Sequence, residues 1–284
     1  MLSRYRWTLF KVAALSALSG VASAQEAATP PAPGDELVVT AQRRSESIMS
    51  VPLAVTALPA DALANAGVTQ TSDLSALVPN LQINSAYGTT QPNFSLRGIS
   101  VANEYNANQA SPVGVYVDDS YLVSRSSHGM QIYDLERIEV LRGPQGTLYG
   151  RNTTGGAINF ITRAPGLAGS NGNLSVGAGD NNSREAHGAF ETTLSENVFG
   201  VRVAFDYKSS DGLIDSLTPG ARDPNSVDSL GGRLALRAQP TPGLDVKLKL
   251  YTGSDEGAQA AVHGIGVGAN GVSTPDQKCI TRAE

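Results

Sequence analysis

The sequence predicts a small mixed α/β (α+β) domain, followed by antiparallel strands of an incomplete transmembrane β-barrel. Three observations predict this fold class. Short helix and strand patterns bounded by turn residues fill the region 45–165. Alternation of apolar and polar residues begins after Pro165, as in strands of outer-membrane barrels, although a soluble β-sandwich would alternate similarly. No run after the amino terminus reaches the roughly 20 apolar residues that a membrane-crossing helix needs.

Residues 1–24 are predicted to be a secretory signal peptide. Arg4, Arg6 and Lys11 precede an apolar stretch of small residues, and Ala22-Ser23-Ala24 supplies the small-x-small cleavage pattern. The apolar stretch is too short for a transmembrane anchor and is followed by Gln25. A short buried helix is the alternative.

The composition agrees with an exported, strand-rich protein. The 284 residues include 30 glycines and a single cysteine, Cys279, which cannot form an intramolecular disulfide. Loss of the signal peptide would leave 18 of the 21 basic residues against 26 acidic ones, so the formal net charge would move from -5 to -8. An acidic chain lacks the basic footprint that nucleic-acid binding requires, so no nucleic-acid partner is expected.

Residues 25–44 are predicted to form a flexible arm. The stretch 25–34 is small, polar and rich in proline, so it cannot bury enough apolar surface to offset its ordering entropy. Leu37, Val38 and Val39 then form a short patch of β-prone residues. Such a patch can add as a strand to the sheet edge of a partner, or it can be the first strand of the following domain.

The region 45–165 is predicted to fold as one small domain with its own core. Helical patterns at 59–65 and 71–78 end before Gly67 and Pro79. Three β-rich runs bounded by turn residues follow at 113–117, 138–141 and 157–162. About 120 residues are enough for an independent core.

The run from Asp134, DLERIEVLRGPQGTLYGRNTTGGAINFITRAP, resembles the plug domain of TonB-dependent outer-membrane receptors. VPLAVTALPADAL at 51–63, FSLRGIS at 94–100 and VGVYVDDSYL at 113–122 are similar to plug segments and occur in the same order. The resemblance covers nearly all of the domain. It implies a Gram-negative outer-membrane importer for a scarce nutrient such as an iron-siderophore, with TonB, membrane lipid and the small-molecule ligand as partners.

The resemblance also implies roles for individual residues. The segment before the plug would be the TonB box, comprising Glu36, Leu37, Val38, Val39, Thr40 and Ala41. Arg97 and Arg142, each just before a glycine, would form a latch to glutamates on the inner barrel wall. Two solvated arginines at strand ends are the alternative.

Ligand contacts are expected from plug loops at 85–91, 101–109 and 121–127. The candidates are Tyr87, Tyr105, Asn106 and Tyr121, because aromatic rings and amides suit a chelate or a glycan. Each could equally be an ordinary loop residue.

Other chemistries find no support in the sequence. The glycine-rich stretch 150–156 has Gly156 where a phosphate-binding loop needs lysine, so its glycines are expected to serve turns and close backbone packing. The three histidines and Cys279 lack the spacing of a metal site, and no G-x-S-x-G elbow is present. We predict no catalytic site, no metal and no cofactor, and therefore no enzyme.

After Pro165 the alternating segments are 174–178, 186–194, 201–208, 233–239 and 244–250. The joints at 195–197 and 240–243 are tight, whereas 209–230 is long, as expected for short periplasmic turns and longer outer loops. The tight connection at 180–182 departs from that rule. Region 166–284 is too short to close a barrel of about 22 strands, so a truncated receptor is expected. The rival interpretation is a soluble periplasmic plug-like binding protein.

Overall fold

A computed structural model describes residues 37–85, 91–103, 106, 109–129, 132–212 and 222–258. The predicted signal peptide, Cys279 and most of the predicted arm lie outside the described residues. The described chain carries a mixed α/β domain and a separate sheet of five long antiparallel strands, which confirms the predicted fold class. Among the helices in these ranges, none has the length and apolar character that crossing a bilayer requires.

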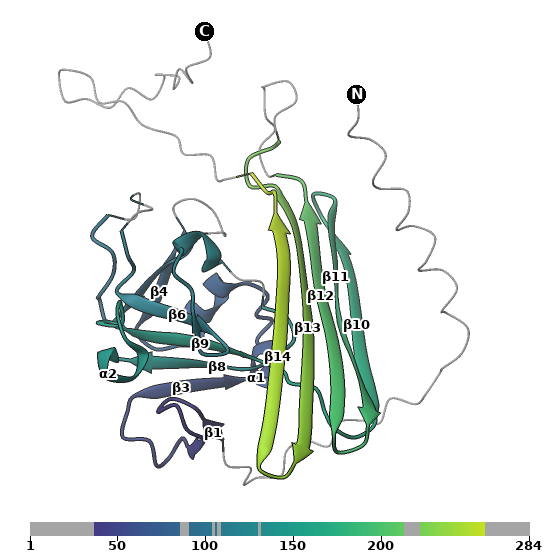
Figure 1. Cartoon of the computed structure of the whole chain (residues 1–284). Helices are drawn as coiled ribbons and strands as arrows, with labels where there is room; N and C mark the ends of the chain where they lie inside the picture. The colour runs from purple at the N-terminus through teal and green to yellow at the C-terminus, as the bar shows by residue number, and fades with distance from the viewer. Residues whose placement is uncertain are drawn as a thin grey trace, which may run out of the picture. The chain divides into compact units, whose positions relative to one another are not determined.

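The mixed α/β domain, for which the sequence predicts a plug and which is called the plug below, is built on a five-stranded mixed sheet (Figure 1). Its strand order is β3-β8-β9-β6-β7, in which β6 and β9 are parallel and the other neighbours antiparallel. The strands are β3 (Val55–Pro59), β6 (Val113–Val117), β7 (Ser120–Tyr121), β8 (Leu135–Arg142) and β9 (Gly156–Thr162). The three β-rich runs found in the sequence therefore lie in β6, β8 and β9.

Short helices and a small hairpin complete the domain. The predicted first helix is α1 (Ala60–Asn65), after which Gly67 turns the chain at a φ of +66°. The predicted second helix is a six-residue 3-10 helix, η1 (Thr71–Ala76), whose amino end is closed by a reciprocal capping box between Gln70 and Asp73. The remaining elements are β4 (Leu81–Asn84) paired with β5 (Asn93–Leu96), η2 (Arg125–Ser127) and α2 (Gly146–Tyr149).

Two apolar clusters hold these elements together. The larger cluster lies between the helices and the sheet, and Leu74, Phe94, Val115, Ile138 and Phe160 are among its fully buried members. The smaller cluster contains Tyr116, Leu141, Tyr149 and Ala157, and it also buries Val39 and Ala41. Residues from before the plug are therefore part of its core.

The arm prediction needs a correction over 37–44. Val38–Val39 forms β1, which pairs antiparallel with β2 (Glu46–Ser47), and the side chains of Val39 and Ala41 are fully buried. The alternative interpretation of this patch, a first strand of the following domain, describes its position in the structure. Burial of the two apolar side chains explains why this short segment is ordered.

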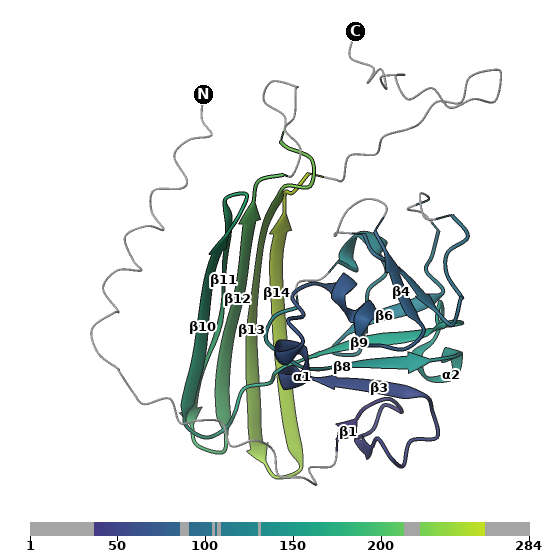
Figure 2. The same ribbon diagram turned by 180° about the vertical axis from the view of Figure 1, so that it is seen from behind.

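The second sheet consists of five long strands that follow one another in chain order (Figure 2). They are β10 (Ser170–Gly179), β11 (Ser183–Ser195), β12 (Phe199–Ser210), β13 (Val227–Thr241) and β14 (Leu244–Asp255). Each contains one of the five segments predicted from alternation. The tight joints expected at 180–182, 195–197 and 240–243 are present as the connections β10–β11, β11–β12 and β13–β14.

The polarity of this sheet is inverted relative to a soluble protein. On β12, Val203 and Phe205 are 49% and 39% exposed, whereas Arg202 and Asp206 are 5% and 2% exposed. The register extends the pattern across strands, because Phe190, Val203, Leu234 and Leu250 lie side by side on β11 to β14. One face is thus apolar and uncovered, and the other is charged and covered.

The structure also explains one of the glycines in the run 143–156. Gly156 has a φ of +151°, and a Cβ there would lie 2.2 Å from the backbone oxygen of Leu141 on the adjacent strand. Close backbone packing at this position, as the sequence predicts, excludes any side chain.

Gly156→Ala is expected to lower the free energy of unfolding by about 3 kcal/mol or more, because it combines a strained φ with a backbone clash. Chemical denaturation followed by circular dichroism measures this change. Gly146→Ala is the matched control, since a Cβ there has no atom within 4 Å and should be nearly neutral. Equal stability of the two variants would contradict the packing.

Candidate functional site

The segment 37–43 is held on the plug by polar and apolar contacts. The backbone N–H of Thr40 donates to Glu139 Oε1 at 2.7 Å, and Arg137 Nε donates to the same oxygen at 2.8 Å. The Arg43 guanidinium lies 5.0 Å from the centre of the Tyr149 ring, within range of a cation–π contact. The described part of the predicted TonB box is therefore docked, while Glu36 lies outside the described residues.

The plug meets the long strands through Asp134, the residue before β8. Its carboxylate accepts hydrogen bonds from Arg202 Nε on β12 at 3.0 and 3.2 Å and forms an ion pair with Arg233 on β13. Arg233 Nη2 also donates to the Asp134 backbone oxygen at 2.7 Å, and Glu191 Oε2 accepts from Arg202 Nη1 at 2.7 Å. The three charged side chains of Asp134, Arg202 and Arg233 are almost fully buried.

A second plug carboxylate, Asp118, meets β14. Lys249 Nζ donates to Asp118 Oδ1 at 2.9 Å and to Thr162 Oγ1 at 2.6 Å, and the Tyr251 hydroxyl also bonds to Asp118. Burial raises the pKa of Asp118, but the hydrogen bonds from Lys249, Thr162 and Tyr251 outweigh burial and hold the pKa below its usual value. The carboxylate is therefore ionised at neutral pH.

The sequence pattern does not predict that Asp118 and Asp134 pair with the long strands. Both adopt a positive φ, +47° and +48°, at which Asp and Asn are enriched, and both stand in turns beside β-rich runs. A signal did exist, because Arg202, Arg233 and Lys249 occupy the polar positions of alternating strands. Covered cations need carboxylate partners, but the pairing depends on tertiary structure.

The latch residues Arg97 and Arg142 stay predictions. Among the described residues neither has an ion pair, and Arg142 Nε is buried without a partner. The Arg97 side chain lies beside the glycine that follows Arg142, because a Cβ on Gly143 would lie 3.3 Å from Arg97 Nη1. The plug-to-strand ion pairs that the structure contains have the opposite polarity, with acids on the plug and bases on the strands.

The predicted ligand residues fall into three groups. Tyr87 and Tyr105 lie outside the described residues. Asn106 is exposed, and its backbone oxygen accepts from Arg125 Nη1 at 2.6 Å, so the loops 101–109 and 121–127 are tied together. Tyr121 packs at 5.4 Å against Tyr116 and accepts from Asn152 Nδ2 at 2.8 Å. Tyr121 is half-buried against the cluster that contains Val39, and its role as a ligand residue stays a prediction.

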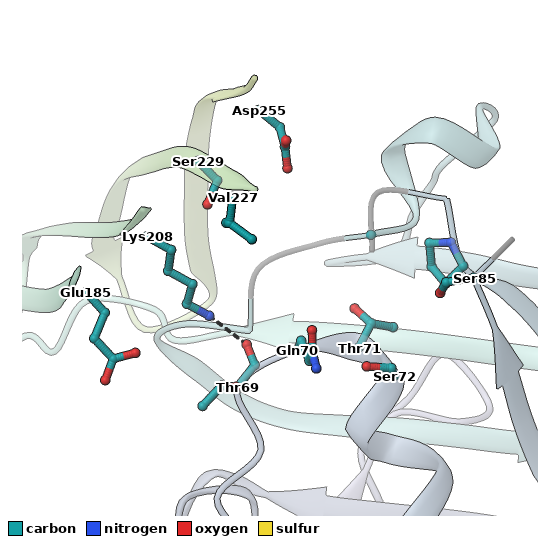
Figure 3. Close-up of a pocket in the computed structure, with 12 residues that line it drawn as sticks. Thr69, Gln70, Thr71, Ser72, Ser85, Glu185, Lys208, Val227, Ser229 and Asp255 are labelled. Atoms are coloured by element: carbon teal, nitrogen blue, oxygen red, sulfur yellow. Dashed lines mark hydrogen bonds between the residues drawn. The ribbon is translucent and has the colours of Figure 1, made fainter. Parts of the chain in front are cut away.

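A polar cleft lies between the turn 69–72 of the plug and strands β11 to β14 (Figure 3). Lys208 Nζ crosses it and donates to the Thr69 backbone oxygen at 2.8 Å. Ser85, at the start of a predicted ligand loop, also lines the cleft. The other polar lining residues are Gln70, Thr71, Ser72, Glu185, Ser229 and Asp255. Such a lining suits a polar ligand with several hydrogen-bonding groups.

No three His, Cys, Asp or Glu side chains gather into a metal-binding group within the described ranges. His128 is a buried histidine, a residue type that often binds metals. Burial lowers its pKa, and its Nε2 contacts the Leu122 backbone oxygen at 3.2 Å. The neutral imidazole is thus a packed core group.

Residues 47–157 match the family described as the TonB-dependent Receptor Plug Domain. The match extends from before β3 to the first two residues of β9, so it contains both plug carboxylates and all of the mixed sheet except most of β9. This part of the chain is therefore a TonB-dependent receptor plug domain.

Named relatives are receptors of the same class. The chain is 38% identical over 130 residues to the pesticin receptor of Yersinia pestis, covering 45% of this chain and 19% of that protein. It is 30% identical over 170 residues to the ferripyoverdine receptor of Pseudomonas aeruginosa, covering 59% and 20%. The crystal structure of the ferric yersiniabactin uptake receptor of Yersinia pestis superposes with a TM-score of 0.68 at 26% identity, covering 75% of this chain and 33% of that one. The chain thus spans about a fifth of the length of these curated relatives.

Asp134→Asn is expected to destabilise the protein by about 3 kcal/mol or more, because it leaves the buried charges of Arg202 and Arg233 without their carboxylate. Asparagine tolerates the positive φ, so the change isolates the charge. Thermal unfolding of the detergent-solubilised chain measures the effect. Asp180→Asn, in the exposed β10–β11 turn, is the control, and equal midpoints for the two variants would contradict the role of Asp134.

Asp118→Asn is expected to lower the unfolding midpoint at pH 7, and this difference from the parent protein should narrow progressively as the pH falls below about 4. The pKa of Asp118 is depressed in the folded state, so its stabilisation is complete above the unfolded value of about 3.9 and is lost as the pH falls through the folded value. The measurement is a pH series of thermal midpoints. Asp119→Asn, at an exposed neighbour that also has a positive φ, should show no such pH-dependent gap. A gap of constant size over the whole pH series would exclude the ion pair as its cause.

Proposed function

We propose that the chain forms the plug and the first barrel strands of a TonB-dependent outer-membrane receptor. The receptor takes up a scarce nutrient, such as a ferric siderophore, in an energy-coupled step. The observation that carries this proposal is the seating of a plug domain, through Asp118 and Asp134, against the charged face of a sheet whose opposite face is apolar.

The inverted sheet supports an outer-membrane location in a Gram-negative cell. Leu174, Val176, Phe190 and Leu248 are each more than half exposed on the uncovered face. Exposure of such an apolar surface to water is unfavourable, whereas contact with the hydrocarbon of a membrane is favourable. Strands of 10 to 15 residues reach or exceed the ~9–11 residues that a tilted strand needs to cross the hydrocarbon. The soluble plug-like alternative does not explain this face. The predicted signal peptide would supply export.

The ligand class is proposed from the relatives together with the polar cleft. The relatives bear the names of pesticin, ferripyoverdine and ferric yersiniabactin. In this chain the cleft around Lys208 and the loop that contains Asn106 offer hydroxyl, amide and charged groups for a polar chelate. Tyr87, Tyr105 and Tyr121 remain candidates for aromatic contacts.

Energy coupling is proposed to act through the segment 36–41. Addition of this segment as a strand to a TonB sheet would use backbone groups around Val38 and Val39. In the docked state β1 pairs with β2 and Val39 is fully buried, so the segment must leave the plug before it can pair elsewhere. The docked structure then corresponds to the resting state.

Val38→Pro is expected to abolish binding of the chain to the purified periplasmic domain of TonB, because proline removes a backbone donor from the pairing segment. Isothermal titration calorimetry measures the affinity. Val123→Pro is the control, since Val123 is also an exposed valine but lies outside the segment. Unchanged affinity of the Val38→Pro variant would exclude 36–41 as the TonB-binding segment.

A further inference from the structure

Glu139 is a fully buried carboxylate in the middle of β8. It lies opposite Ala57 of β3 on one side and Asn159 of β9 on the other. An ionised side chain in such a place costs several kcal/mol unless it is paired and hydrogen-bonded. Loss of a contact to Glu139 is therefore expected to cost more stability than loss of a contact to an exposed acid.

Two of the contacts to Glu139 come from the segment before the plug. The Thr40 N–H donates to Oε1 at 2.7 Å, and the Thr40 hydroxyl lies 3.2 Å from Oε1 and 3.3 Å from Oε2. The third comes from Arg137 Nε, and Arg137 Nη2 also reaches the Thr40 hydroxyl at 3.4 Å. Within the described residues, Thr40 and Arg137 are the partners of this carboxylate.

The polar contact does what the neighbouring apolar contacts cannot do alone. Val39 and Ala41 bury against Leu141 and Tyr149, but a buried apolar surface does not fix the register of a strand by itself. Thr40 reaches Glu139 in one register only, since a shift by one residue turns each side chain to the opposite face. The pair therefore selects the docked position and adds to its stability.

We propose that Glu139, oriented by Arg137, retains the segment 37–41 on the plug through Thr40. Here the latch means this contact between Glu139 and Thr40, and not the predicted pair Arg97 and Arg142. The latch sets the fraction of molecules in which the segment is free, and it would thereby tune the apparent affinity for TonB. The identity of the released segment as the TonB-binding one rests on the proposed function. The latch contact does not.

The test measures how often the segment leaves the plug, by thiol labelling of the full chain in detergent. With Cys279→Ser as background, Val39→Cys is the sole thiol and reports on segment release. Val115→Cys, also a fully buried valine but in the larger cluster of the plug, reports on general opening. The labelling rate of each reporter is compared across latch variants.

Glu139→Gln is expected to raise the labelling rate at position 39 about tenfold or more, because hydrogen bonds to a charged group are worth at least the ~1.4 kcal/mol that equals a factor of ten. Thr40→Val should raise the labelling rate at position 39 severalfold. Thr40→Ser, which keeps the hydroxyl, should label at the rate of the protein with Thr40. Glu136→Gln is the control on the same strand, because the Glu136 side chain is 53% exposed and pairs with Arg137 Nη1, whereas Glu139 accepts from Arg137 Nε. It should leave the rate unchanged.

Two results would overturn the latch. One is equal labelling of position 39 in the Glu139→Gln and Glu136→Gln variants. The other is an equal rise at positions 39 and 115, which would mean that the whole plug opens. Titration with the TonB domain separates this proposal from the broader one. Faster labelling in a protein that does not bind TonB at all would support the latch and refute the coupling role of the segment.

Discussion

The constraint on which the structure depends is the inverted polarity of strands β10 to β14. Their alternation places arginine and lysine on the covered face and apolar side chains on the uncovered one. Covered cations are stable only with carboxylate partners, and the plug supplies these as Asp134 and Asp118. The plug is therefore more than a filler of space, because it neutralises the charged wall against which it sits. The polar cleft beside Lys208 belongs to the same wall.

Much of this fold could be predicted from the sequence, because its strongest patterns are local. The five long strands follow from period-two alternation, and β6, β8 and β9 follow from β-rich runs between turns. The patch 37–41 was harder, since two-residue strands gain their stability from the cluster around Tyr149 and not from their own residues. The helix predicted at 71–78 is a 3-10 helix over Thr71–Ala76, and the sequence pattern does not specify the helix type.

The candidate site was predicted less well, for a physical reason. Ion pairs such as Asp134 with Arg202 join residues 68 positions apart, and no local pattern indicates which acid meets which base. The resemblance implies a role for Arg97 and Arg142, which stays a prediction, and it does not indicate the plug acids Asp118 and Asp134. Tyr121, in a predicted ligand loop, packs against Tyr116, a contact that the sequence does not indicate, and its role toward a ligand stays a prediction. The docked segment depends on both local sequence and tertiary structure. It is a local β-prone patch, and the distant carboxylate of Glu139 holds it in place.

The central claim is that the apolar face of these strands meets lipid while the charged face meets the plug. Spin labels at single cysteines on β12 in reconstituted bilayers test it most directly. Labels at positions 203 and 205 should collide with oxygen dissolved in the hydrocarbon, whereas a label at Ala204, which is 1% exposed, should be inaccessible to it. Equal accessibility at the three positions, or the opposite alternation, would contradict the orientation of the sheet and the seating of the plug upon it.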